Sequence, residues 1–370
     1  MKILFVGLGN LGSQVFDLFL LRGAEKHTFL VAGRNPEYLR QRTSLPAYAA
    51  LQLGLTPEVE CAYMDVQDVE QTAQTIWSFK PDLIFSSVTV QPSSAIAKLP
   101  KPVFEELAQA GPGPWLPLTL VLVYKLMQAV KQTGLDITVL NGASPDNAGS
   151  VLSKVNLAPT TGIGNLANVV PVIRKAIALQ LNRHVEQVQI LFIGHNQVAH
   201  SLRMSGTPGK APYHLTALAD GEEVTHLLDL QAIFATLPAT LRHEYTQLLS
   251  AASAAAVFEA ITTKGSRIVH APGPNGLPGA YPIRGSEQRV EVVLPQGLTL
   301  AEAIRMNQEG QRLDGIERID ENGTVYFSEH NMAILKQTLG YECRFMPLAE
   351  VEYWARELRA KYLELAKRVT

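Results

Sequence analysis

The stretch Lys2-Ile3-Leu4-Phe5-Val6-Gly7-Leu8-Gly9-Asn10-Leu11-Gly12 decides the fold of this chain. Its first part, Lys2–Val6, is a short run of aliphatic and aromatic residues, which is typical of a buried parallel strand. Apolar residues then recur at helical spacing, which predicts an amphipathic helix over roughly Leu11–Arg22. A Gly-x-Gly-x-x-Gly motif between a strand and a helix indicates a turn that binds a dinucleotide.

Each glycine of this turn has an expected role. Gly7 permits the tight turn, Gly9 lets the backbone approach a pyrophosphate, and Gly12 lets the helix pack closely on the strand. The helix N-terminus offers free N–H groups and partial positive charge to the phosphates. The alternative is a glycine-rich turn without a ligand. We therefore predict cofactor contacts along the whole turn, from Gly7, Leu8, Gly9, Asn10, Leu11 and Gly12.

The end of the second predicted strand, His27–Ala32, bears on the choice of cofactor. An acidic residue there binds the ribose hydroxyls of NAD, but this chain has Gly33-Arg34-Asn35. The Arg34 guanidinium is suited to a 2′-phosphate, and Arg40 and Arg42 can assist. The sequence predicts NADP bound by Gly33, Arg34 and Asn35. NAD remains possible if Arg34 is only a solvated surface residue.

Further strands and helices alternate through the first half. Strands are predicted at residues 59–64, 82–86 and 137–140, and helices at 69–79 and 116–132. This alternation predicts an α/β fold with a doubly wound parallel sheet, a Rossmann domain. Ser86, Ser87 and Val88 follow the fourth strand, where the chain passes the nicotinamide half of the cofactor, so we predict that they line it. A plain serine turn is the alternative.

Length and composition limit the classes of protein. The 370 residues are 46% hydrophobic and 18% charged with a net charge of −2, which favours two domains and disfavours nucleic-acid binding. We expect a dinucleotide-binding domain over 1–150 and an α+β substrate and dimerisation domain over 151–370. The alanine-rich helix 251–261 is expected to pack on a partner helix, in the same chain or across a homodimer.

The two cysteines, Cys61 and Cys343, are far apart in the sequence. They indicate neither a disulfide framework nor a metal cluster. The longest apolar stretch, residues 115–123, is too short to span a bilayer, and no targeting signal precedes the first strand. The sequence therefore predicts a cytoplasmic protein that binds no metal, no membrane and no nucleic acid.

The second half contains three polar or glycine-containing motifs, each next to a predicted strand or helix. Asn141 and Asp146 follow the fifth strand, Gly162–Leu166 precedes a helix over residues 169–181, and Gly194-His195 ends a strand over residues 188–193. This order resembles the lactate/malate dehydrogenase superfamily. The resemblance implies that Asn141 contacts the nicotinamide ribose or the substrate. It also implies that His195 exchanges a proton with the substrate, a role that suits the pKa of histidine.

The chain departs from that pattern at charged positions. Ala167 stands where the family has the aspartate that orients its histidine, so Asn165 is predicted to bond His195. The following helix lacks the family's arginine, which leaves Arg284 as the best carboxylate binder, and a simple 2-hydroxy acid is not the expected substrate. His200 and Arg203 are expected on an alternating strand. The turn at Arg34 and the serine pair are also similar, over the first half only, to saccharopine-dehydrogenase-type reductases.

These observations favour an NADP(H)-dependent oxidoreductase that transfers a hydride to or from a carbonyl or imine of a small metabolite. Its predicted catalytic residues are His195, Asn165 and Arg284. A sensor that keeps the nucleotide site without catalysis is the alternative. A third possibility is glycoside cleavage with transient use of NAD, but it needs a metal site for which Cys61 and Cys343 are poorly placed.

Overall fold

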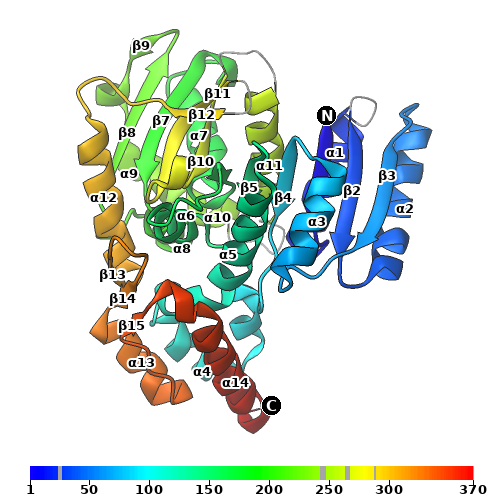
Figure 1. The fold of residues 1–370 in the computed structure, drawn as a ribbon. Coiled ribbons are helices and arrows are strands. Elements are labelled where there is room, and N and C mark those ends of the chain that lie inside the picture. The colour runs from blue at the N-terminus through cyan, green and yellow to red at the C-terminus, as the bar shows by residue number, and fades with distance from the viewer. Residues whose placement is uncertain (24–26, 242–246, 263–266, 287–288, 370) are drawn as a thin grey trace.

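The computed structural model describes residues 1–23, 27–241, 247–262, 267–286 and 289–369. Its first half contains a six-stranded sheet of order β3-β2-β1-β4-β5-β6, in which all pairings are parallel (Figure 1). The strand order reverses between β1 and β4, and ligands of such sheets bind beyond the carboxyl ends at that point. The strands are β1 (Lys2–Val6), β2 (Thr28–Gly33), β3 (Glu58–Tyr63), β4 (Leu83–Ser86), β5 (Thr138–Asn141) and β6 (Thr161–Gly162).

Helices connect these strands, and the doubly wound parallel sheet predicted from the sequence is confirmed. Helix α2 was not predicted, because Pro46 lies inside it and its apolar residues form no clear stripe. The helices of this half are α1 (Asn10–Gly23), α2 (Pro36–Gln52), α3 (Val69–Phe79), α4 (Lys101–Ala108), α5 (Leu116–Thr133) and α6 (Pro145–Ser153).

The second half is built around an antiparallel sheet of order β10-β11-β7-β8-β9, with β12 paired to β11. Its strands are β7 (Val188–Gly194), β8 (Tyr213–Ala219), β9 (Glu222–Glu223), β10 (Ile268–Pro272), β11 (Ala280–Ser286) and β12 (Arg289–Val292). Its helices are α7 (Val170–Gln180), α8 (Asn196–Ser205), α9 (Leu230–Ala235), α10 (Leu237–Leu241), α11 (Gln247–Thr262) and α12 (Leu300–Leu313). The α+β class is confirmed, but the strand expected for His200 and Arg203 is wrong, because both lie on α8.

The chain ends in a small sheet of order β13-β14-β15 with two helices. The last helix packs against α5, and Figure 1 shows it away from the antiparallel sheet. Lys125 of α5 pairs with Glu352 at 2.9 Å, and the Tyr362 hydroxyl donates to the Ala95 carbonyl at 2.8 Å. These elements are β13 (Ile316–Ile319), β14 (Val325–Phe327), α13 (Glu329–Leu339), β15 (Phe345–Met346) and α14 (Val351–Val369).

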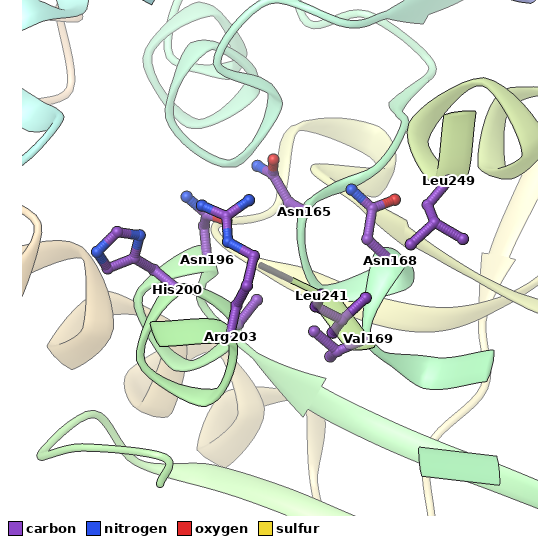
Figure 2. Close-up of a pocket in the computed structure, with 9 residues that line it drawn as sticks. Asn165, Asn168, Val169, Asn196, His200, Arg203, Leu241 and Leu249 are labelled. Atoms are coloured by element: carbon purple, nitrogen blue, oxygen red, sulfur yellow. The ribbon is translucent and has the colours of Figure 1, made fainter. Parts of the chain in front are cut away.

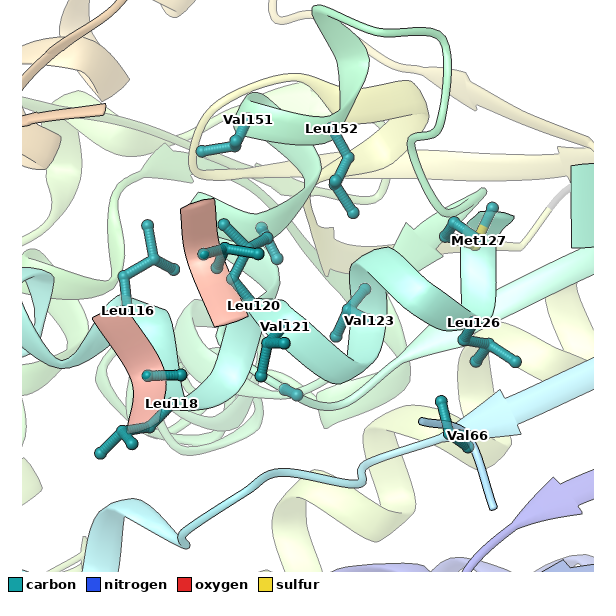
Figure 3. Packing of buried hydrophobic residues seen from close by; sticks show 14 of the residues in the cluster. Val66, Leu116, Leu118, Leu120, Val121, Val123, Leu126, Met127, Val151 and Leu152 are labelled. Carbon is teal, nitrogen blue, oxygen red and sulfur yellow. The ribbon is translucent and has the colours of Figure 1, made fainter. Parts of the chain in front are cut away.

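Both faces of the parallel sheet are buried, as the unbroken apolar run of β1 predicts. Leu4 and Val6 belong to a core built around α5 (Figure 3), which the C-terminal helices complete. Ile3 and Phe5 belong to a second core, shared with α1 and α11. Residues from both halves therefore fill the same cores, and β6 extends the parallel sheet beyond residue 150. The domain boundary at 150 stays a prediction.

The described helices were also compared with the length and hydropathy that a bilayer requires. Within residues 1–23, 27–241, 247–262, 267–286 and 289–369, none combines sufficient length with sufficient apolar character to cross a membrane.

Candidate cofactor cleft and active site

The glycine turn has the shape that a dinucleotide requires. Gly7 adopts φ +73°, its N–H donates to the Ala32 carbonyl at 2.8 Å, and a Cβ there would lie 2.8 Å from Val88 Cγ1. A Cβ on Gly12 would lie 2.9 Å from the Gly7 carbonyl oxygen. Gly9 is different, because a Cβ built on it meets no atom within 4 Å. The protein itself therefore needs Gly7 and Gly12, while Gly9 leaves open space beside the backbone.

The open space lies at the start of α1. That helix begins at Asn10 and has no acidic residue in its first turn, so its positive end is not neutralised there. Tyr38 of α2 reaches over the turn, with its hydroxyl 3.4 Å from the Leu8 carbonyl. These features fit the phosphates of a dinucleotide, and Tyr38 is an aromatic group at this edge that sequence reasoning missed.

The predicted phosphate-binding arginine lies at the end of β2. Arg34 is exposed, and the neighbouring Asn35 caps α2 by accepting a hydrogen bond from the Tyr38 N–H at 3.0 Å. Arg40 pairs with Glu37 at 2.9 Å and Arg42 with Asp17 at 2.6 Å. Of these three arginines, Arg34 alone makes no ion pair with the described part of the chain.

The wall opposite the glycine turn comes from β4 and β5. Ser86 is 2% exposed, and its hydroxyl has no hydrogen-bond partner in the described structure. Ser87 lies between the turn and β5, since its Oγ is 3.5 Å from a Cβ on Gly12 and its Cβ is 3.0 Å from one on Gly142. The structure therefore brings Ser86 and Ser87 next to the glycine turn.

Asn141, predicted to contact the cofactor, is buried and bonded within its own turn. Its Oδ1 accepts from the Ala143 N–H and its Nδ2 donates to the Ala143 carbonyl, both at 2.9 Å. Contact with a ligand would have to share or replace these bonds. The following residue of the motif, Asp146, is 2% exposed and lies at the start of α6.

Asp146 joins the two other motifs of the second half. Asn165, in the left-handed backbone conformation at φ +54°, donates from Nδ2 to Asp146 Oδ2. The N–H of Asn196, next to His195, donates to Asp146 Oδ1 at 3.2 Å. Burial raises the pKa of the Asp146 carboxyl to about 6. The structure shows no direct hydrogen bond between Asn165 and His195, because Asn165 bonds Asp146, which also accepts from the N–H of the residue after His195.

His195 is fully buried and hydrogen-bonded at both ring nitrogens. Nδ1 accepts from the Gln197 N–H at 3.3 Å, capping α8, so Nε2 carries the proton and faces Asn147 Oδ1 at 3.3 Å. Asn147 Nδ2 donates in turn to Asp314 Oδ2 at 3.2 Å. Burial lowers the pKa of His195 to about 3, so the ring is neutral.

Helix α12 closes the cluster from the other side. Asn307, Gly310 and Asp314 follow a helical spacing of three and four, and a Cβ on Gly310 would collide with His195. Burial, and to a smaller extent the charge of Asp146, raises the pKa of Asp314 to about 8. Sequence reasoning missed this stripe, although buried polar residues around a glycine on one helix face were a readable signal.

Arg284 does not join this cluster. It lies on β11, exposed, opposite Glu291 of β12. Ala280 of the same strand pairs with Gly194, so Arg284 is four residues, or about 13 Å, further along. Its predicted role as a carboxylate binder stays a prediction without support from this arrangement.

A cavity of about 140 Å³ adjoins the cluster (Figure 2). Asn165 and Asn196, which both bond Asp146, form part of its wall, and the Arg203 guanidinium points toward them. Burial lowers the pKa of Arg203, which makes no ion pair with the residues described. The other lining residues are Asn168, Val169, Ala199, His200, Leu241 and Leu249.

Comparison with known proteins gives structural likeness only. No protein-family model and no curated protein sequence matches the chain. Malate dehydrogenase from Aeropyrum pernix has a TM-score of 0.56 at 16% identity, over 84% of this chain and 96% of that one. Lactate dehydrogenase from Eimeria maxima, solved with NADH and oxamate, has 0.56 at 14% identity, over 84% and 91%.

A third solved structure agrees with these two. Malate dehydrogenase from Plasmodium falciparum, in complex with NADH, has a TM-score of 0.54 at 13% identity, over 85% of this chain and 96% of that one. Such low identity carries the fold and not the residues of a site. The resemblance read from the order of motifs is confirmed at that level: this chain has the fold of the malate and lactate dehydrogenases.

Proposed function

We propose that this protein is an NADP(H)-dependent oxidoreductase that acts on a carbonyl or imine of a small metabolite. The observation that carries the proposal is the open space beside Gly9, where a Cβ would meet no atom of the protein within 4 Å. A pyrophosphate would fill this space. The malate dehydrogenase from Plasmodium falciparum and the lactate dehydrogenase from Eimeria maxima, which share the fold, were solved with NADH.

The residues in and around the glycine turn fit successive parts of the cofactor. The turn from Gly7 to Gly12 would hold the pyrophosphate, and Arg34 a 2′-phosphate. Ser86 and Ser87 would line the nicotinamide half, because Ser86 offers a buried hydroxyl without a partner. A bound nicotinamide would supply the hydride. The chain itself would bind and orient the substrate, exclude water and exchange the proton at the group around Asp146 and His195.

A nucleotide-binding sensor remains the second candidate, because His195 is fully buried and its ring nitrogens are occupied. The two functions differ in one measurement. A reductase consumes NADPH in the presence of an oxo or imino compound, whereas a sensor binds NADPH without turnover.

The cofactor assignment is tested with NADPH and NADH titrations followed by fluorescence. Replacing Arg34→Ala should weaken NADPH binding by about tenfold or more, because a charge-assisted contact worth about 1.5–3 kcal/mol is lost. NADH binding should not change. Arg40→Ala is the matched control, since Arg40 already pairs with Glu37. Equal effects of Arg34→Ala on both nucleotides would contradict the NADP assignment.

A further inference from the structure

Two buried carboxyl groups near His195 make no ion pair with any of the residues that the structure describes. Asp146 is 2% and Asp314 is 1% exposed. Asp146 bonds to the Asn165 amide and the Asn196 N–H, and Asp314 to the Asn147 amide. Neither carboxyl makes an ion pair with a lysine or arginine of the described chain, and their hydrogen-bond donors are amides. A buried carboxylate without a cation is unfavourable, and a cationic or N–H-bearing ligand relieves that cost.

Further unpartnered groups lie on the same side. The Tyr281 hydroxyl and both amide atoms of Asn307 are fully buried and have no hydrogen-bond partner in the described structure. Tyr281 lies within the electrostatic reach of Asp146. It also lies beside Asn307, although the two do not meet hydrogen-bond geometry. Buried polar groups are nearly always satisfied, so these atoms are hydrogen-bonding groups that the described chain leaves unused.

The opposite charge lies on the cavity side of the same wall. The half-buried Arg203 guanidinium points toward the Asn165 and Asn196 side chains (Figure 2). Asn165 bonds Asp146 through its side-chain amide, whereas Asn196 does so through its backbone N–H. No ion pair joins Arg203 to Asp146 in the described part of the chain, where Asp146 bonds the Asn165 amide and the Asn196 N–H. Within the described residues, the site thus presents a cation and a buried carboxyl group that make no ion pair, and the Asn165 carboxamide bonds that carboxyl group.

We propose that this site takes a substrate that carries both a carboxylate and an amine or imine nitrogen, with Arg203 binding the carboxylate and Asp146 the nitrogen. The substrate N–H would replace the Asn165 amide on Asp146. Val169, Leu241 and Leu249 on the cavity wall favour an aliphatic side chain. An oxo acid fits less well, because its carbonyl oxygen offers Asp146 no donor.

The inference rests on the proposed function for its chemistry. In the direction of oxidation, the Cα–H bond would break, and a bound oxidised nicotinamide dinucleotide would supply the acceptor for its electron pair and hydrogen as hydride. A proton leaves the nitrogen for the Asp146 carboxylate, and a C=N double bond forms. Water then adds to the carbon and ammonium leaves, which gives an oxo acid. Asp146 returns its proton to solvent.

Binding is measured first, as the shift in melting temperature and by calorimetry, with and without saturating NADPH. The probes are L-valine and L-leucine, each compared with its counterpart lacking the nitrogen (isovalerate, isocaproate) and with its counterpart lacking the carboxylate (isobutylamine, isoamylamine). We expect at least one amino acid to stabilise the protein and its two counterparts to have little effect. Amino-acid-dependent reduction of NADP is the second readout.

Variants separate specific binding from a change of fold. Arg203→Gln and Asp146→Asn should each weaken amino-acid binding by about tenfold or more and leave NADPH binding unchanged. Arg203→Lys should retain part of the amino-acid binding. Arg183→Gln is the control, because Arg183 lies outside the cavity, near Asp220. Melting temperature and circular dichroism without ligand check that each variant folds.

The outcomes distinguish the two proposals. If NADPH binds but neither amino acid does, or if the deaminated acids bind equally well, the inference is overturned and the proposed function stands. Unchanged binding in folded Arg203→Gln and Asp146→Asn also overturns it. If amino acids bind and neither nucleotide does, the ligand class is supported and the oxidoreductase proposal fails.

Discussion

Around the glycine turn, the identity of some residues is required by contacts within the protein, while that of others is not. Gly7 and Gly12 are required by contacts at 2.8 and 2.9 Å within the protein, while Gly9 has open space on its side. Likewise, Asn35 has a structural task as the cap of α2, while Arg34 beside it has no ion pair in the described chain. Gly9 and Arg34 have no contact within the described chain that requires a glycine or an arginine, and a bound cofactor would explain these residue types best.

The Gly9→Ala and Gly12→Ala variants separate these two cases. Gly9→Ala should leave the free energy of unfolding within about 1 kcal/mol of wild type, because its Cβ meets nothing. It should weaken nucleotide binding by about tenfold or more, since the Cβ enters the space of the pyrophosphate. Gly12→Ala should lower the melting temperature, because its Cβ presses on the Gly7 carbonyl. Unchanged nucleotide affinity of Gly9→Ala would remove the main support for the cofactor site.

The pKa of Asp314, raised to about 8, predicts how stability depends on pH. A carboxyl whose pKa is higher in the folded state binds more protons there, so its stabilisation is lost as pH rises through the folded pKa. His195 and His270 have lowered pKa values of about 3, so their effect appears only below their unfolded pKa of about 6.5. Asp146, whose pKa is raised to about 6, is mostly deprotonated above about pH 7.

Between pH 6.5 and 8, Asp314 therefore dominates. The free energy of unfolding, measured with urea, should fall by about 2 kcal/mol over this range, at about 1.4 kcal/mol per proton and pH unit. Asp314→Asn should flatten the decline. An equally steep decline in the Asn variant would show that another group causes it.

At the scale of elements, helix caps and helix faces decide how the motifs are used. His195 ends β7 as predicted, but it caps α8 and is covered by α12. The α12 face that covers it carries Asn307 and Gly310, Asp314 caps the C-terminus of this helix, and all three residues are buried. A polar buried face of this kind is stable only if its groups find partners, which links α12 to the proposed site.

Close approach of α12 to His195 depends on Gly310. Gly310→Ala should destabilise the protein by about 1–3 kcal/mol, because the new methyl group overlaps the His195 side chain. The exposed neighbour Glu309→Ala serves as the control on the same helix and should change stability by about 0.5 kcal/mol or less. Thermal unfolding measures both, and similar values for the two variants would contradict the packing of α12 described here.

At the scale of the whole molecule, the C-terminal elements complete the core of the first half. Leu358 of α14 is fully buried in the cluster around α5, together with Leu4 and Val6 of β1. Helix α11 contributes in the same way to the other face of the sheet, where Phe258 lies 4.5 Å from Phe19 between ring centroids. The alanine-rich helix thus packs on α1 of the same chain, one of the two expectations for it, and the homodimer stays a prediction.

Two leucines on α14 test this shared core. Leu358→Ala should lower the free energy of unfolding by about 2–5 kcal/mol, because it leaves a cavity between α14 and α5. Leu363→Ala, on the same helix but 44% exposed, should cost about 0.5 kcal/mol or less. Urea unfolding followed by circular dichroism compares them. A small effect of Leu358→Ala would indicate that the C-terminal helix does not stabilise the rest.

The sequence by itself determined the parallel strands of the first half, the glycine turn and their order. The strand at Lys2–Val6, the glycine turn and the alternating strands could be predicted because hydrophobic period and glycine position act over a few residues. The strand expected around His200 and Arg203 was wrong, because the capping of α8 by His195 gave a helix in its place.

Only the tertiary structure decided which polar groups meet. Asn147 bonds Asp314, which is 167 residues away in the sequence, and Asp146 bonds Asn165 and Asn196 from separate elements. It also buried His195 beneath Gly310, left Arg284 outside the cluster and turned Arg203 toward the cavity. Such contacts depend on how helices pack on sheets, and local patterns do not encode that packing because it requires the whole core to form at once.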